Sequence, residues 1–144
     1  MSHLISVGTW EVKAIEKSVD DGLARGIKTS GPFHYWMIER YVIGLTEPPP
    51  RVKVSAPRRF VPVHGQPVTA ILPTFLHLQR MLQIQLDRAA GLDLARVKVP
   101  TPILSVMKLG LGATFAQIAA HERRHLAQAR RVLDRLGAGT LVSQ

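Results

Sequence analysis

One uninterrupted helical segment constrains the fold of this chain more than any other feature. Residues 114–136 (TFAQIAAHERRHLAQARRVLDRL) contain neither glycine nor proline, and Gly137 follows them directly. Thr114 and Gln117 match a capping box, so the pattern predicts a helix that begins near Thr114 and ends at Gly137. One stripe recurs at helical spacing and consists of Ile118, His121, His125, Ala129, Val132 and Leu136.

This stripe places the imidazoles of His121 and His125 on the face that a helix in a bundle would bury. A buried imidazole needs either a ligand or hydrogen-bond partners, so the two histidines are candidates for a binding site. The helix carries its positive charges elsewhere. The residues expected to point away from the bundle are Arg123, Arg124, Arg130 and Arg131.

The composition restricts both the class of protein and its chemistry. With 144 residues, 46% of them hydrophobic and 20% charged, the chain is long and apolar enough for one globular domain. It has no cysteine, so any metal must be held by histidines and carboxylates. No apolar run is long enough to span a membrane and no signal peptide is evident, so we expect a cytoplasmic protein without membrane association.

The formal net charge of +9 would permit binding to nucleic acid or another anionic surface. Aromatic residues make up only 6% of the chain, and neither an RNA-binding fingerprint nor a helix-turn-helix pattern is present. We therefore interpret the arginines as a solvated basic face and do not expect nucleic-acid binding. That alternative would predict a steep dependence of binding on salt.

Three further helices are expected, over about residues 3–25, 33–45 and 67–90, which gives an all-α bundle. His3 heads the inward stripe of the first of these, followed by Val7, Trp10 and Ala14. The stripe of the third consists of Ile71, Phe75, Leu78, Leu82, Leu86 and Ala89, and its outward residues are Gln79, Arg80, Gln83 and Arg88.

Prolines predict irregular segments between these helices. The Pro-rich basic stretch 47–66 reads as a long crossover loop, and residues 97–102 as a second crossover before an apolar turn at 103–109. No pair of strands is expected. Of the other histidines, His34 is expected to pack at an interface, and His64 and His77 to lie in solvent.

The segment His121-Glu122-Arg123-Arg124-His125 matches the zinc-peptidase pattern, in which Glu122 would be the general base. Such a site needs a third ligand further along, but no histidine or glutamate follows and only Asp134 remains. The peptidase interpretation is therefore disfavoured.

Two alternatives remain for the histidine pair. In one, His121 and His125 are core histidines bonded to carbonyls or to each other. In the other, His3 joins them, and three neutral imidazoles hold Zn²⁺ or Ni²⁺, which could acidify a bound water or thiol. Spacing alone does not bring His3 to the pair.

The segments GPFHYWMIERYVIGLTEPPPRVKVSAPRRFVP and VPTPILSVMKLGLGATFAQIAAHERRHLAQARRVL resemble the DinB-like superfamily, also called YfiT-like or damage-inducible-like. The resemblance covers nearly the whole chain. It implies one domain over 1–144, a four-helix bundle of up-down-down-up type with metal-site helices at 2–26 and 113–136 and the Pro-rich loop at 47–66.

The resemblance also implies a site and a chemistry. A divalent metal, nickel or zinc, would be bound by His3, which matches the His-Leu pair of the family's second helix, and by His121 and His125. Characterised relatives are thiol-dependent transferases or isomerases, so a metal-dependent thiol transferase or hydrolase acting with a low-molecular-weight thiol is expected. An anionic cosubstrate could meet Arg51, Arg58 and Arg59.

The chain departs from the family pattern because only Met1 and Ser2 precede the His-Leu pair, where relatives have a first helix. Either the start of the sequence is placed too late or the protein lacks this helix. An N-terminally shortened bundle would leave an apolar face open, and we expect a homodimer to cover it. The alternative to an enzyme is a non-catalytic dimeric bundle with a degenerate metal site.

Overall fold

The structure is a computed structural model that describes residues 2–29, 31–49, 57–61, 67–102 and 106–141. Its helices are α1 (Ser2–Ala24), α2 (Met37–Thr46), the one-turn 3-10 helix η1 (Arg58–Phe60), α3 (Val68–Arg88) and α4 (Leu111–Leu141). Two short strands, β1 (Lys98–Pro100) and β2 (Lys108–Gly110), complete the described part. The protein is mainly helical, as the sequence predicts.

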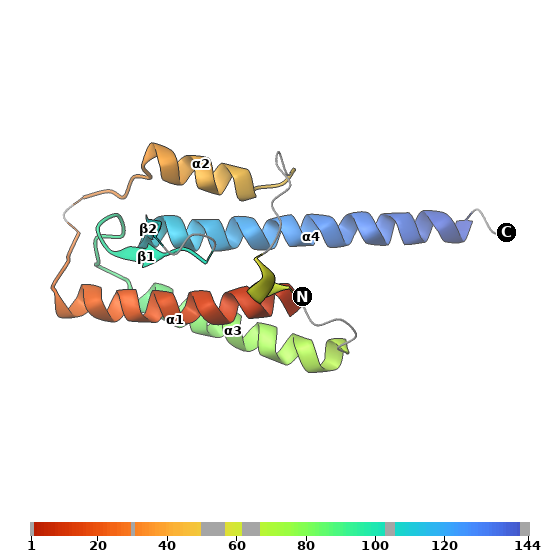
Figure 1. Ribbon diagram of the computed structural model, residues 1–144, viewed down its shortest axis with the longest axis horizontal. Coiled ribbons are helices and arrows are strands. Elements are labelled where there is room, and N and C mark those ends of the chain that lie inside the picture. Colours follow the sequence, from red (N-terminus) through yellow and green to blue (C-terminus); the bar gives the residue numbers. More distant parts are fainter. Residues whose placement is uncertain (1, 30, 50–56, 62–66, 103–105, 142–144) are drawn as a thin grey trace.

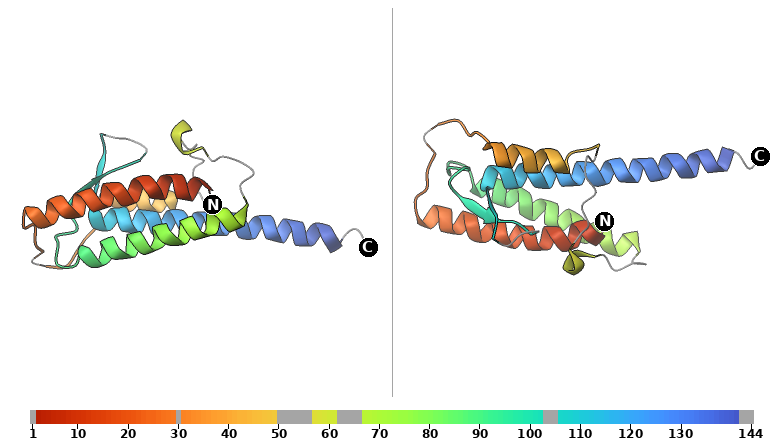
Figure 2. Two further views of the ribbon diagram at one scale, coloured as in Figure 1. Left: turned by 90° about the horizontal axis from the view of Figure 1, so that it is seen from below. Right: turned by 45° about the horizontal axis from the view of Figure 1, so that its top comes forward.

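The three long helices lie side by side, and α1 and α3 run in the same direction while α4 runs against both (Figure 1). The shorter α2 lies along the first half of α4, on the side away from α3 (Figures 1 and 2). This arrangement leaves α1, α3 and the first half of α4 to enclose the interior.

The main hydrophobic core lies where α1, the end of α3, the strand pair and the start of α4 meet. Ile15, Val19, Val99 and Leu111 are fully buried there. Burying each of these side chains stabilises the fold by about 1.5–3 kcal/mol. The complete cluster of buried residues is Ile15, Val19, Ala89, Leu92, Val97, Val99, Leu111 and Ile118.

The expected extents of α1 and α3 are confirmed, but one face of α3 differs from the prediction. Gln85 is buried, whereas Leu86 is 45% exposed. The reason is geometric, because Ile71, Leu78 and Gln85 are spaced by seven residues and share the buried face, while Leu86 is rotated by about 100° from it. Gln79, expected to point outward, is half-buried and bonds to α4.

The expectation of no strand pair is wrong. β1 and β2 pair antiparallel, with Val99 opposite Leu109, and Thr101 N–H donates to the Met107 carbonyl at 3.0 Å. Each strand has only three residues, which is too short for an alternating pattern to stand out, and Pro100 obscures the first. The pairing matters because it buries Val99 and Leu109 against the helices.

Both predicted ends of α4 are wrong. The helix begins at Leu111 and continues through Gly137 to Leu141. Thr114 cannot act as its cap, because the Thr114 hydroxyl donates to the Gly110 carbonyl oxygen at 3.1 Å. The second half of α4 extends past the other helices (Figures 1 and 2). The stripe expected to be buried is therefore exposed there, by 54% at Val132 and 65% at Leu136.

The connection from α1 to α4 also differs in detail. Helix α2 begins at Met37 and not at Phe33, and its Glu39 is almost fully buried. The Glu39 carboxyl accepts from the backbone N–H of Trp36 at 2.9 Å and of Gly110 at 2.8 Å, which ties α2 to the start of α4. His34 is exposed and does not pack as expected, whereas His77 is exposed as predicted.

Several predictions fall outside the described residues. Most of the Pro-rich loop, including Arg51 and His64, and part of the turn at 103–109 belong to the segments 50–56, 62–66 and 103–105. None of the described helices carries an apolar stretch of the length needed to cross a bilayer.

Candidate metal centre

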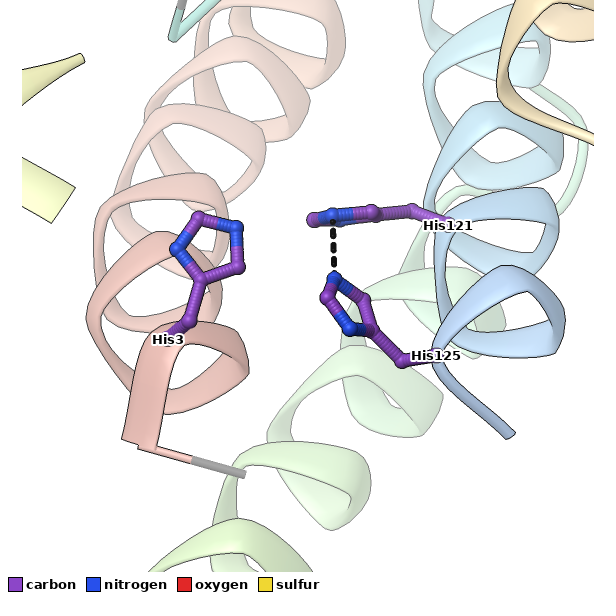
Figure 3. Close-up of side chains that lie close together, drawn as sticks. All are labelled: His3, His121 and His125. Carbon is purple, nitrogen blue, oxygen red and sulfur yellow. Dashed lines mark hydrogen bonds between the residues drawn. The ribbon is translucent and has the colours of Figure 1, made fainter. Parts of the chain in front are cut away.

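The structure brings together the three histidines that the sequence singles out. His3 lies in the first turn of α1, and His121 and His125 lie one turn apart on α4 and face it (Figure 3). One ring nitrogen of each histidine lies within 4.8 Å of those of the other two. The side chains form a half-buried cluster between two helices that are far apart in the sequence.

The ring of His121 meets the rings of His3 and His125 edge to face, and the rings of His3 and His125 are tilted by 53°. The Nε2 atoms of His121 and His125 are 3.0 Å apart, so one ring donates its N–H and the other accepts (Figure 3). The ring centroids of His3 lie 5.5 Å from His121 and 5.4 Å from His125. A donor and an acceptor nitrogen in contact require at least one neutral imidazole.

Backbone and side-chain partners hold two of the rings from outside. The Nδ1 atom of His3 lies 2.8 Å from the carbonyl oxygen of Phe60, in η1. A carbonyl can only accept, so Nδ1 of His3 carries a proton, and in the neutral form of this ring the lone pair is on Nε2. Gln128 makes a side-chain hydrogen bond with His125. Metal-binding histidines usually have outer partners of this kind.

Burial keeps the α4 histidines neutral. It lowers the pKa of His121 to about 4, with further contributions from His125, His3 and Arg124. Burial, followed by the proximity of His3, also lowers the pKa of His125. At neutral pH these two rings therefore present lone pairs and not positive charges.

Three imidazoles without a thiolate fit a borderline cation such as Zn²⁺ or Ni²⁺. Ligand atoms around one tetrahedral Zn²⁺ lie roughly 3.3 Å apart, given bonds of about 2.0–2.1 Å. The separation of up to 4.8 Å is wider, so the rings would have to close slightly. Half-buried side chains at the end of the bundle can rotate to do so. The donor set thus fits a metal bound by three protein ligands with an open position.

A second polar group lies behind His121. The Glu122 carboxylate accepts from the amide of Gln79, on α3, at 2.6 Å. Glu11, on α1, is 4% exposed, and its Oε1 atom has no hydrogen-bond partner among the described residues. The sequence interpretation missed Glu11, although its position four residues from both Val7 and Ile15 places it on the buried face of α1.

The arginines beside the histidines bond to residues in and just after α2. Arg123 forms an ion pair with Glu47 just beyond α2, on the outer side of α4 as expected. Arg124 is half-buried, contrary to the prediction, because its guanidinium donates to the Leu45 carbonyl at 3.3 Å. Arg58 is exposed in η1.

Comparisons of the chain with protein-family models, with curated proteins and with solved structures give no match. The functional argument therefore rests on the histidine cluster and its surroundings.

Proposed function

We propose that this chain is a DinB-like protein in which His3, His121 and His125 hold a divalent transition metal, Ni²⁺ or Zn²⁺. We further propose that it acts as a metal-dependent thiol transferase or hydrolase. The observation that carries the proposal is the convergence of three imidazole nitrogens within 4.8 Å, with two of the rings kept neutral by burial.

The arrangement of helices supports the family assignment. Helices α1 and α3 run in parallel and α4 runs against them (Figure 1), which is the order of the last three helices in an up-down-down-up bundle. The proximity of His3 on α1 to His121 and His125 on α4 also supports the proposal. In this assignment α2 belongs to the crossover between the second and third helices of the family.

A bound dication would lower the pKa of a coordinated thiol or water and so generate a nucleophile near neutral pH. The residues of this chain would orient the ligands. Phe60 fixes the tautomer of His3, and Gln128 holds the ring of His125. The exposed Arg58, in the same 3-10 helix as Phe60, could bind an anionic cosubstrate beside the site.

Elemental analysis tests the site directly. The protein would be purified without a metal-affinity column, and wild type would be compared with His125→Ala. We expect about one equivalent of nickel or zinc in wild type and a loss in the variant. His77→Ala, at an exposed position of α3, is the matched control and should retain the metal.

An absence of metal in wild type, even after incubation with excess Ni²⁺ or Zn²⁺, would contradict the proposal. A site confirmed in this way would justify assays of thiol transfer and hydrolysis on wild type and His125→Ala. Metal-bound wild type without either activity would favour the non-catalytic alternative.

A further inference from the structure

A small cavity lies between α1, α3 and α4, directly behind the histidine cluster. The polar residues that line it are Glu11, Gln79, His121 and Glu122. The space open to the centre of a water molecule is about 10 Å³. That volume is close to the minimum for one water, and a buried water needs two to four polar partners. The cavity therefore fits a single water among these side chains.

Glu11 is the unusual group in this cavity. Its carboxyl is buried, and the Oε1 atom lacks a partner among the described residues. Burial, reinforced by the charge of Glu122, raises the pKa of Glu11 to about 8. A neutral carboxyl has an O–H donor and an acceptor oxygen, so it can bond to a water in the cavity.

The groups that surround Glu11 contribute little charge besides Glu122. Helix α4 contributes His121 and Glu122, and α3 contributes the uncharged Gln79. A second small cavity on the other side of Glu11 is lined by Trp10, Val99, Pro100, Thr101, Pro102, Leu109, Thr114 and Gln117, which bear no charge. A positive charge that appears at the histidines would therefore favour ionisation of Glu11, because the protein interior screens charges much less than water does.

His121 differs from the other two histidines in its outer contacts. His3 has the Phe60 carbonyl and His125 has Gln128, whereas the one hydrogen bond of His121 within the described residues is the bond to His125. Glu11 and His121 both line the cavity, so a water in it would supply His121 with an outer partner.

We propose that Glu11 is a positioning residue and a counter-charge for the three-histidine site, acting on His121 through one water in this cavity. The inference rests on the proposed metal site. When a divalent cation binds, the O–H bond of the Glu11 carboxyl breaks and the proton leaves through the water to the buffer. The carboxylates of Glu11 and Glu122 then balance the two positive charges that three neutral imidazoles cannot balance.

Calorimetric titration of the metal-free protein with Zn²⁺ at pH 7, in buffers of different ionisation enthalpy, tests the inference. The dependence of the heat on the buffer gives the number of protons released. We expect wild type to release close to one proton more than Glu11→Gln. Glutamine cannot ionise, so the variant lacks one counter-charge for the bound cation. Its affinity for Zn²⁺ should therefore be roughly tenfold lower, at the lower end of the 10–100-fold range that is usual when an outer partner of a ligand is removed.

Two further measurements separate this role from a structural one. Glu16→Gln, on the same helix but not in the cavity, should release as many protons as wild type. In infrared spectra, the band of a protonated carboxyl should disappear when Zn²⁺ is added to wild type and should be absent from Glu11→Gln throughout. Glutamine closely replaces a neutral carboxyl, so the variant is expected to fold.

The outcomes distinguish the two proposals. Equal proton release by wild type and Glu11→Gln would overturn the role of Glu11 and leave the metal site standing. Failure of wild type to bind Zn²⁺ would overturn the site itself, and the role of Glu11 with it.

Discussion

The Nδ1 atom of His3 and the carbonyl oxygen of Phe60 lie 2.8 Å apart, although 57 positions separate the two residues in the sequence. The contact joins the first turn of α1 to η1. Phe60 can hold its carbonyl there because the residue is only 4% exposed. The orientation of one candidate ligand thus depends on an apolar anchor in a crossover segment.

Replacing Phe60 with alanine should therefore weaken metal binding without altering any ligand. The loss of the buried ring would free η1 and with it the carbonyl that orients His3. We expect Zn²⁺ affinity to fall roughly 10–100-fold, the usual range when an outer partner of a ligand is removed. Val61→Ala, at a neighbouring residue that is 55% exposed, is the control and should bind like wild type. Equal affinities in both variants would contradict this role of Phe60.

In the metal-free protein, the contribution of Glu11 to the free energy of unfolding should decrease as pH rises. Burial, and then the charge of Glu122, raises the pKa of Glu11 from its ordinary value of 4.5 to about 8 in the folded chain, so only the unfolded state ionises between these values. The contribution is complete below pH 4.5 and is lost as pH rises towards 8, at up to about 1.4 kcal/mol per unit.

Urea unfolding of wild type and Glu11→Gln over this pH range would measure the component. The free energy of unfolding of wild type relative to the variant should fall by a few kcal/mol, roughly, between pH 4.5 and pH 8. Effects of the histidines are common to both proteins and cancel in the difference. A difference that does not change with pH would show that Glu11 is not held neutral.

The imidazole of His121 should titrate far below the ordinary range in the metal-free protein. Its pKa is lowered to about 4, first by burial and then by His125, so the resonances should shift with a midpoint near pH 4. Because only the unfolded state binds this proton between pH 6.5 and 4, the stability of the fold is greatest above pH 6.5 and is lost progressively as pH falls from 6.5 through 4. In His125→Ala the midpoint should rise, because a neighbouring positive charge is removed. A midpoint near 6.5 in wild type would contradict the burial of this ring.

Among the polar residues, Glu39 should make one of the largest contributions to the free energy of unfolding. Glu39→Ala would leave the backbone N–H groups of Trp36 and Gly110 without their acceptor. A buried donor left unsatisfied costs about 1–3 kcal/mol, so we expect a loss of that size or more in urea unfolding. Asp134→Ala, in the exposed second half of α4, is the comparison and should stay within about 0.5 kcal/mol of wild type. Equal stability of the two variants would contradict the structural role of Glu39.

The sequence predicts the long elements of this fold well and their ends poorly. Apolar periodicity locates α1 and α3 because each buries several side chains along one face. The ends of α4 were predicted wrongly because a Thr-x-x-Gln pattern and a glycine are also compatible with the interior of a long helix. The strand pair was missed because pairing between two three-residue segments depends on tertiary contacts and not on local preference.

The histidine cluster was predicted in part from spacing and in part from resemblance. Periodicity places His121 and His125 on one face, but only the packing of α1 against α4 brings His3 to them. Phe60 and Glu11 carry no motif. Their roles arise from a carbonyl and an unpartnered carboxyl that the fold places beside the rings. Such groups can be identified only from a structure that shows what surrounds each histidine.

The position of His3 opposite His121 has a consequence for the chain as a whole (Figure 3). A cation shared by these residues would act as a reversible cross-link that closes most of the polypeptide into one loop. Because the ion would leave when the chain unfolds, it would stabilise the folded state through its own binding, by about 4 kcal/mol at a free-ion concentration roughly one thousand times Kd. Loss of the ion would then remove this link between the first turn of α1 and α4, so the stability of the fold would depend on the concentration of free metal.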